Sequence, residues 1–212
     1  MSFGYQVLGF GSRATAAILA YLIPQSIRFN DDDTAYMTRT PSVAGNRKTW
    51  TWSAWVKRGN LDSGGASRAF WSVGDNASND RGNFGWDADR ISFYANDGAW
   101  DQLTTTQVFR DPSAWYHIVG VMDTTNATSG DRMRLYVNGV RVTDFSTETQ
   151  PVQNTDHETN NVMRHDIGLY SVSRSSTDHS DSMLADVHFI DGAALTASSF
   201  GETDDNGVWV PI

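Results

Sequence analysis

The chain has 212 residues, a length typical of one large all-β sandwich or of two small domains. Hydrophobic residues make up 39% of the sequence and aromatic residues 12%, which excludes an intrinsically disordered chain. Cysteine is absent, which excludes a disulfide framework, thiolate catalysis and cysteine-ligated zinc. The net charge of −9 argues against a nucleic-acid partner, because binding to nucleic acid depends on neutralising its phosphates.

The first 25 residues differ in composition from the rest of the chain. They contain no acidic residue and a single basic residue, Arg13. Their apolar run, residues 14–23, is about half of the roughly 20 residues that a membrane-spanning helix needs. A signal peptide is also not favoured, because apolar residues stand where a basic region belongs and Pro24 follows the run.

We therefore expect residues 1–25 to form an extended apolar arm, with a short helix over residues 15–21. The arm either docks on another subunit or folds onto its own core, since apolar termini are rarely ordered unless they are tied down. The side chains expected to dock are Phe3, Tyr5, Val7, Leu8, Phe10, Ile18, Leu19, Tyr21, Leu22 and Ile23.

Residues 26–212 have the pattern of a single all-β domain, with a C-terminal tail from about residue 200. Apolar and polar residues alternate with a period of two, which is typical of the strands of a sandwich or barrel. The alternation predicts strands over residues 50–57, 91–96, 115–122, 134–142 and 185–190. In the last of these it places Ala185, Val187 and Phe189 on one face. Both faces of residues 115–122 are apolar, which indicates a central strand.

Shorter signals complete this prediction. Asn138-Gly139 divides residues 134–142 into two strands joined by a type I′ turn, because both residues accept positive φ angles. Residues 193–200 fit one short turn of helix with Thr196 as its N-cap. Four tryptophans are expected in the core, namely Trp50, Trp52, Trp71 and Trp115.

Several strand motifs occur in an order that is typical of one family. They are Ser26-Ile-Arg-Phe-Asn30, Ala35-Tyr-Met37, Trp50-Thr-Trp-Ser-Ala-Trp-Val56, Trp115-Tyr-His-Ile-Val119, Leu135-Tyr-Val-Asn-Gly139, Asp166-Ile-Gly168 and Met183-Leu-Ala-Asp-Val-His-Phe-Ile190. Over about residues 26–200 the chain resembles the laminin-G-like members of the concanavalin A-like lectin/glucanase superfamily. The resemblance implies an antiparallel two-sheet jelly-roll sandwich of about a dozen strands. The chain departs from the family at Leu184, where glycine is usual.

The two ends of the chain carry a second resemblance. The tail, residues 200–211, and the opening residues 3–10 are similar to jelly-roll proteins of tailed phages, which are described as virion structural proteins. This resemblance rests on about 25 residues.

No catalytic motif accompanies the fold signal, so we expect a protein that is not an enzyme. Glucanases of the superfamily place two catalytic glutamates on one strand, at a separation set by their mechanism. Here the glutamates are scattered at Glu148, Glu158 and Glu202. No serine-elbow, P-loop or zincin motif is present.

The laminin-G resemblance implies a rim calcium site built from loop carboxylates, because calcium prefers oxygen ligands. Its candidate ligands are Asp75, Asp80, Asp87 and Asp89, and Asp123 and the acidic run at residues 31–33 are further candidates. The alternative is that these residues only form β-turns. No other cofactor is expected.

A sugar site needs an aromatic platform beside hydrogen-bonding groups. The segment Phe93-Tyr-Ala-Asn-Asp-Gly-Ala-Trp-Asp-Gln102 offers both, and its candidate glycan ligands are Tyr94, Asn96, Asp97, Trp100 and Asp101. Trp55 is a further candidate on a concave face. The alternative for Trp100 is a loop anchor or a contact between subunits.

Two functions follow from these features. The first is a virion structural protein, a capsid decoration (cement) or head-fibre protein that docks through its arm on the major capsid protein or another virion protein. The second is a tail-associated receptor-binding protein or a lectin module that binds a cell-surface glycan. The absence of long shaft repeats favours the capsid over the tail. A homotrimer on the outer surface of the virion is the expected assembly, without a nucleic-acid partner or a membrane span.

Overall fold

The computed structural model describes residues 23–61, 68–75, 81–171 and 179–212. The predicted short helix over residues 15–21 and the docking residues from Phe3 to Leu22 lie outside this part of the chain. No helix among the described residues is long and apolar enough to cross a membrane. The predicted all-β class is confirmed, because strands form two large antiparallel sheets. The helical residues in the described part of the chain belong to two 3-10 turns, η2 (Ser129–Asp131) and η4 (Ala197–Ser199).

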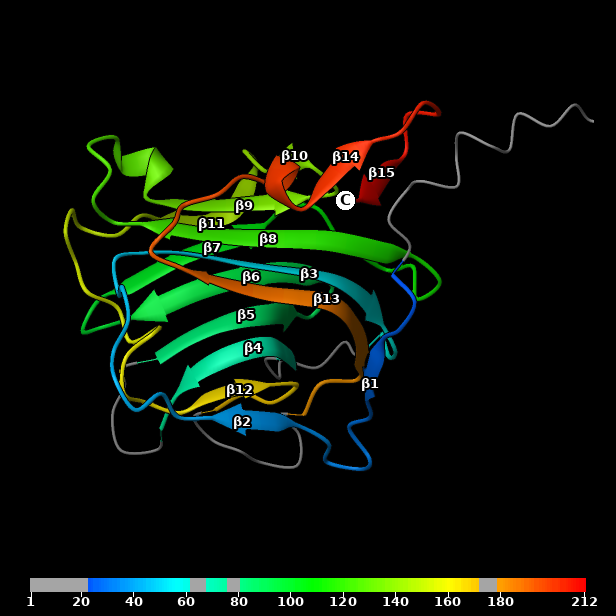
Figure 1. Ribbon diagram of the computed structural model, residues 1–212, viewed down its shortest axis with the longest axis horizontal. Coiled ribbons are helices and arrows are strands. Elements are labelled where there is room, and N and C mark those ends of the chain that lie inside the picture. The colour runs from blue at the N-terminus through cyan, green and yellow to red at the C-terminus, as the bar shows by residue number, and fades with distance from the viewer. Residues whose placement is uncertain (1–22, 62–67, 76–80, 172–178) are drawn as a thin grey trace, which may run out of the picture.

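The two sheets face each other as a sandwich (Figure 1). The six-stranded sheet contains, in spatial order, β1 (Ile27–Phe29), β13 (Ser182–Asp191), β3 (Thr49–Arg58), β8 (Trp115–Asp123), β9 (Met133–Val137) and β10 (Val140–Arg141). The seven-stranded sheet contains β11 (Phe145–Thr149), β7 (Trp100–Thr105), β6 (Arg90–Asn96), β5 (Arg81–Asp87), β4 (Arg68–Gly74), β12 (His165–Ile167) and β2 (Met37–Arg39). β14 (Gly201–Thr203) and β15 (Trp209–Pro211) form a third, two-stranded sheet that shares no strand pairing with the other two.

The core lies between the inner faces of the two sheets and is mainly aromatic. Trp52 of β3 meets Phe84 of β5 edge to face, with ring centroids 4.9 Å apart, and Phe84 contacts Phe93 of β6 at 5.0 Å. Gly120 of β8 allows this approach, because a Cβ there would lie 2.8 Å from the Phe84 ring. The predicted burial of Trp50, Trp52 and Trp71 is confirmed.

Two details of the predicted pattern are wrong. Trp115 begins β8 and is 36% exposed, because the alternation of the strand directs it away from the core. In β13 the register shifts between Ala185 and His188, where Asp186 takes a φ of +51°. This bulge moves Phe189 onto the inner face, opposite to that of Ala185, so the two do not share a face as the simple alternation predicts.

The local turn predictions hold better. β9 and β10 pair across Asn138 and Gly139, whose φ values of +47° and +81° are those of the predicted hairpin turn. β8 lies between β3 and β9, as expected for a central strand. Thr196 does precede the short helical turn η4, although its hydroxyl bonds to the Ser198 hydroxyl and caps no backbone N–H.

The C-terminal tail covers the outer face of the six-stranded sheet. Val119, Val121 and Tyr136 lie on this face and form a second buried cluster with Ala197 and Phe200. Trp209 of β15 packs against the same cluster. Figure 1 shows β14 and β15 beside the strands β8 and β9 that they cover. Since the tail buries this face, it belongs structurally to the sandwich.

Candidate functional site

An exposed aromatic side chain marks the turn between β6 and β7, on the outer face of the seven-stranded sheet. Trp100 is 47% exposed, and its ring lies against Tyr94 with centroids 5.3 Å apart. The Arg81 guanidinium of β5 lies 4.9 Å from the Trp100 ring centroid, a cation–π distance. We call these three side chains the Trp100 platform.

Polar side chains continue from this platform across the same outer face. Gln102 of β7 donates from Nε2 to the hydroxyl of Thr104 at 2.8 Å, and that hydroxyl lies 3.1 Å from the Ser92 hydroxyl. On the neighbouring strand β11, Thr147 and Thr149 are exposed and pair in register with Thr104 and Gln102. Ser92 and Thr104 are themselves buried, so the groups that this face offers beside the aromatic ring are the half-buried Gln102 amide and the exposed hydroxyls of β11. Hydroxyl and amide groups beside a ring suit a polyhydroxylated ligand.

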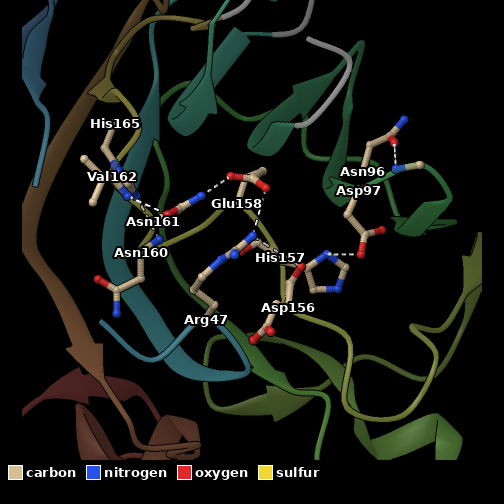
Figure 2. Close-up of polar contacts among 11 residues, drawn as sticks. Arg47, Asn96, Asp97, Asp156, His157, Glu158, Asn160, Asn161, Val162 and His165 are labelled. Atoms are coloured by element: carbon tan, nitrogen blue, oxygen red, sulfur yellow. Dashed lines mark hydrogen bonds and ion pairs between the residues drawn. The ribbon is translucent and has the colours of Figure 1, made fainter. Parts of the chain in front are cut away.

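The other side of the same turn points into the end of the sandwich. Asp101 pairs in register with the buried Ala95 and is 5% exposed. Its Oδ2 lies 3.4 Å from Nε2 of His157, and Oδ2 of Asp97 lies 4.0 Å from Nδ1 of the same ring. His157 is fully buried, and Figure 2 shows its ring directed towards Asp97. We call Asp97, Asp101 and His157 the acidic–histidine cluster.

A network of hydrogen bonds holds His157 in place. Nε of Arg47 donates to the main-chain oxygen of His157 at 2.6 Å, and the His157 N–H donates to the oxygen of Arg47 at 3.4 Å. Nη2 of Arg47 also pairs with Glu158 at 2.8 Å, and Asn161 donates to the second oxygen of that carboxylate at 2.6 Å (Figure 2). On the opposite side, Oδ1 of Asn96 accepts the Gly98 N–H and so fixes the turn that carries Asp97.

Burial shifts the proton affinities within the cluster. It raises the pKa of the Asp101 carboxyl to about 6, and the neighbouring charge of Asp97 adds to this effect. Burial also lowers the pKa of the His157 imidazole, because the charged ring would lose its hydration. The imidazole is therefore neutral at pH 7, with one nitrogen lone pair available as a ligand.

The five predicted glycan residues do come together at the β6–β7 turn, but they separate onto two sides. Tyr94 and Trp100 lie on the outer face, whereas Asp101 points inwards and Asn96 is used by the turn itself. Sequence reasoning missed His157, which lies 56 residues after Asp101 and has no ligand spacing in the sequence. Its one signal is its position between two acidic residues, in Asp156-His157-Glu158.

The residues predicted to bind calcium lie elsewhere. Asp89 pairs with Arg58 at 3.1 Å and with Arg110 at 2.5 Å, and these guanidinium groups lower the pKa of its carboxyl. Asp87 is exposed at the end of β5, Asp75 follows β4, and Asp80 lies outside the described residues. Among the described residues, Asp97, Asp101 and His157 are the group whose ligand atoms lie close enough together for one metal ion, and the described calcium candidates do not belong to it.

Trp55 and an apolar cavity at the edge of the sandwich lie apart from this turn. Trp55 is 9% exposed and lies on the outer face of the six-stranded sheet, with its ring 5.0 Å from that of His117. A cavity of about 650 Å³ opens at the edge of the sandwich between β2, β12 and β13. Its lining includes Met37, Val43, Trp71, Ile167 and Phe189, so it is largely apolar and lies apart from the β6–β7 turn.

Comparisons with known proteins agree with this architecture. A family model described as the concanavalin A-like lectin/glucanases superfamily matches residues 30–199. A search of curated proteins found no match. Many solved structures are similar, among them domains LG4-5 of the mouse laminin α1 chain, with a TM-score of 0.57 and 11% identity. That alignment covers 82% of this chain and 44% of the laminin chain.

Two further structures have similar scores. The heptameric SAP-like pentraxin of Limulus polyphemus gives a TM-score of 0.54 at 15% identity, over 85% of this chain and 77% of the pentraxin. The binding domain of botulinum neurotoxin serotype G gives 0.51 at 16% identity, over 84% of this chain and 44% of that domain. This chain thus spans less than half the length of the laminin and neurotoxin chains. At these identities the similarity is one of fold.

Proposed function

We propose that this chain, which belongs to the concanavalin A-like lectin/glucanases superfamily, is a non-enzymatic carbohydrate-binding module. The observation that carries the proposal is the exposed Trp100, held against Tyr94 and Arg81. The half-buried Gln102 amide and the exposed Thr147 and Thr149 hydroxyls lie on the same face. An aromatic ring stacks on the apolar face of a sugar, while neighbouring polar side chains bond to its hydroxyls. The ligand is a saccharide presented on a surface.

The burial of the acidic groups supports binding over hydrolysis. A glycosidase needs two carboxyl groups that flank a sugar bond in an open cleft. In this chain the Asp101 side chain is 7% exposed and the adjoining His157 side chain is fully buried. A sugar ring cannot enter between them. The platform on the other side of the turn consists of Trp100, Tyr94 and Arg81, none of which carries a carboxylate.

A glycan array tests this function. The purified full chain is applied to immobilised mammalian and bacterial surface glycans, and the strongest binder is then measured by calorimetry. Trp100→Ala is expected to raise its Kd at least about tenfold, because a central tryptophan contributes more than 1 kcal/mol at most binding sites. Trp115→Ala is the matched control, since Trp115 is also exposed but lies on the six-stranded sheet. Failure of the wild-type chain to bind any glycan, or equal binding by Trp100→Ala, would contradict the proposal.

The setting of this module in our proposal is the outer surface of a phage particle. The support is the resemblance of residues 200–211 and 3–10 to tailed-phage structural proteins, together with the acid-free, apolar composition of residues 1–25. In this setting the arm docks on the major capsid protein or another virion protein and the sandwich faces solvent, as a homotrimer. Many copies per particle would multiply weak glycan contacts through avidity.

Copy number tests this setting separately. Mass spectrometry of purified particles gives the ratio of this chain to the major shell protein. Hundreds of copies are expected for a capsid decoration protein, whereas a few tens or fewer would place the chain at the tail or at a vertex. Deletion of residues 1–25 is expected to leave a folded sandwich that no longer joins particles. Normal incorporation of the shortened chain would overturn the role of the arm, and absence of the chain from particles would overturn the setting.

A further inference from the structure

The acidic–histidine cluster has the composition and spacing of a metal site. One ligand atom from each of Asp97, Asp101 and His157 can be chosen so that all three lie within 4.8 Å of one another. The 3.4 Å between Asp101 Oδ2 and His157 Nε2 is close to the roughly 3.3 Å that separates two ligands of a tetrahedral zinc ion with bonds of about 2.0–2.1 Å. These two side chains therefore need little movement to share an ion.

An independent observation points to a missing ligand. His157 is fully buried, yet neither of its ring nitrogens makes a hydrogen bond. A buried polar group without a partner costs about 1–3 kcal/mol, so native proteins rarely leave one. Both nitrogens face carboxylates at distances too long for a hydrogen bond, 3.4 Å to Asp101 and 4.0 Å to Asp97. A cation bound to one ring nitrogen would give that nitrogen and the carboxylates a partner, while the other ring nitrogen would carry the proton.

We propose that Asp97, Asp101 and His157 bind a divalent metal ion of the zinc class at the inner side of the β6–β7 turn. The donor set selects this class over calcium. Calcium takes six to eight oxygen ligands, whereas one imidazole nitrogen with two carboxylates suits zinc, cobalt or nickel. Three protein ligands leave a fourth position, which water can fill from the side of Asp97, whose side chain is 20% exposed.

The surroundings of the cluster are already organised for binding. Arg47 fixes the main chain of His157, because it donates to the His157 main-chain oxygen and accepts the His157 N–H. The same guanidinium pairs with the Glu158 carboxylate. The Asn96 side chain fixes the turn on which Asp97 stands. Because such outer contacts orient the ligands before the metal arrives, little conformational entropy is lost on binding.

Direct metal uptake tests the proposal. The full chain is stripped with a chelator and titrated with Zn²⁺ by calorimetry, and Co²⁺ serves as a spectroscopic probe of coordination by nitrogen and oxygen. We expect one ion per chain, and a rise in Kd of at least about tenfold in Asp101→Asn and in His157→Gln. Asp156→Asn is the matched control, because Asp156 is exposed beside His157 and lies outside the cluster. It should bind Zn²⁺ like the wild type.

Three outcomes would overturn the site. They are no uptake of Zn²⁺ or Co²⁺ by the wild type, uptake that is unchanged in both ligand variants, and uptake of Ca²⁺ that His157→Gln leaves unaffected. Circular dichroism checks that each variant is folded. If the variants at the buried positions fail to fold, Asp97→Asn replaces them, because its side chain is partly exposed. Metal uptake is read without any sugar, so this result is independent of glycan binding.

Discussion

The two outer faces of the sandwich differ in what covers them. On the six-stranded sheet, Val119 and Val121 are completely buried, because the C-terminal tail packs over them through Phe200 and Trp209. On the seven-stranded sheet, the described strands β6, β7 and β11 carry hydroxyl and amide side chains, and Trp100 stands nearly half exposed among them. One face is apolar and closed by the chain itself, whereas the other is polar along β6, β7 and β11 and presents the Trp100 ring beside Tyr94.

The tryptophans outside the core of this sandwich are therefore of two kinds. Trp209 and Trp100 both lie outside the main core, but Trp209 packs on an apolar cluster and donates its indole N–H to His117 at 3.0 Å. Trp100 has no apolar cluster beneath it and instead lies against Tyr94 and Arg81. Trp209 contributes to stability, and Trp100 is available for a ligand. The predictions below test this division.

The largest effect is expected from acid, which should loosen the closed face. His117 accepts the Trp209 N–H at Nδ1, so its proton must be on Nε2, which donates to the Ser53 hydroxyl at 2.9 Å. Burial lowers the pKa of His117 from 6.5 to about 4, while Asp186 raises it and His188 lowers it by smaller amounts. Between pH 6.5 and pH 4, His117 binds a proton in the unfolded chain but stays largely neutral in the folded chain. The contribution of His117 to the free energy of unfolding should therefore fall by roughly 3 kcal/mol between pH 6.5 and pH 4.

Urea unfolding of the wild type and of His117→Gln across this pH range measures the effect. Burial also lowers the pKa values of His157 and His165, and it raises those of Asp101 and Asp181, which act in the opposite direction because the folded chain then binds the proton more readily. The wild type alone would report the sum of all these groups, whereas the difference between the wild type and His117→Gln isolates the share of His117. Identical slopes in the two proteins would show that His117 does not link the tail to pH.

The next largest effect on stability is expected from removing the Trp209 side chain, which covers the outer face of the six-stranded sheet. Trp209→Ala exposes part of the cluster around Val119 and Tyr136 and leaves the His117 imidazole without its donor. We expect the free energy of unfolding to fall by about 2 kcal/mol, less than for a fully buried tryptophan, since Trp209 is only partly buried. Glycan binding should be unchanged, because the Trp100 platform lies on the other sheet. Val208→Ala, at a 56% exposed position of the same hairpin, is the control. Equal losses of stability in Trp209→Ala and Val208→Ala, or a loss of glycan binding in Trp209→Ala, would contradict the assignment of different roles to the two faces.

Much of the fold could be predicted from the sequence because period-two alternation and turn residues act locally. The hairpin at Asn138-Gly139 and the burial of Trp50 and Trp52 follow from neighbours in the sequence. The bulge at Asp186 could not be predicted in this way, since it depends on how β13 pairs with β3. Nor could the covering of β8 by residues 197–209, because two apolar faces look alike until their partner is known.

The candidate site was predictable to the same local extent. Tyr94 and Trp100 are close in sequence and share a hairpin, so their proximity follows from the strand pattern. The inward direction of Asp101 also follows from alternation with Trp100, although the turn composition suggested a solvent-exposed group. His157 and Arg81 reach the turn from other parts of the chain. Only the packing of the loop at residues 156–163 against this end of the sandwich brings His157 there.

The smallest predicted effect is on glycan affinity, and it separates the contribution of Arg81 to the Trp100 platform from that of the Trp100 ring. Arg81→Met removes the charge over the Trp100 ring but keeps an unbranched side chain of similar length. A cation–π contact at an exposed site contributes about 0.5–1 kcal/mol, so we expect the Kd for the strongest glycan to rise about two- to fivefold, with stability nearly unchanged. Arg81→Lys keeps the charge and should retain most of the affinity. If Arg81→Met binds like the wild type while Trp100→Ala does not, the ring alone makes the platform and Arg81 only covers its edge.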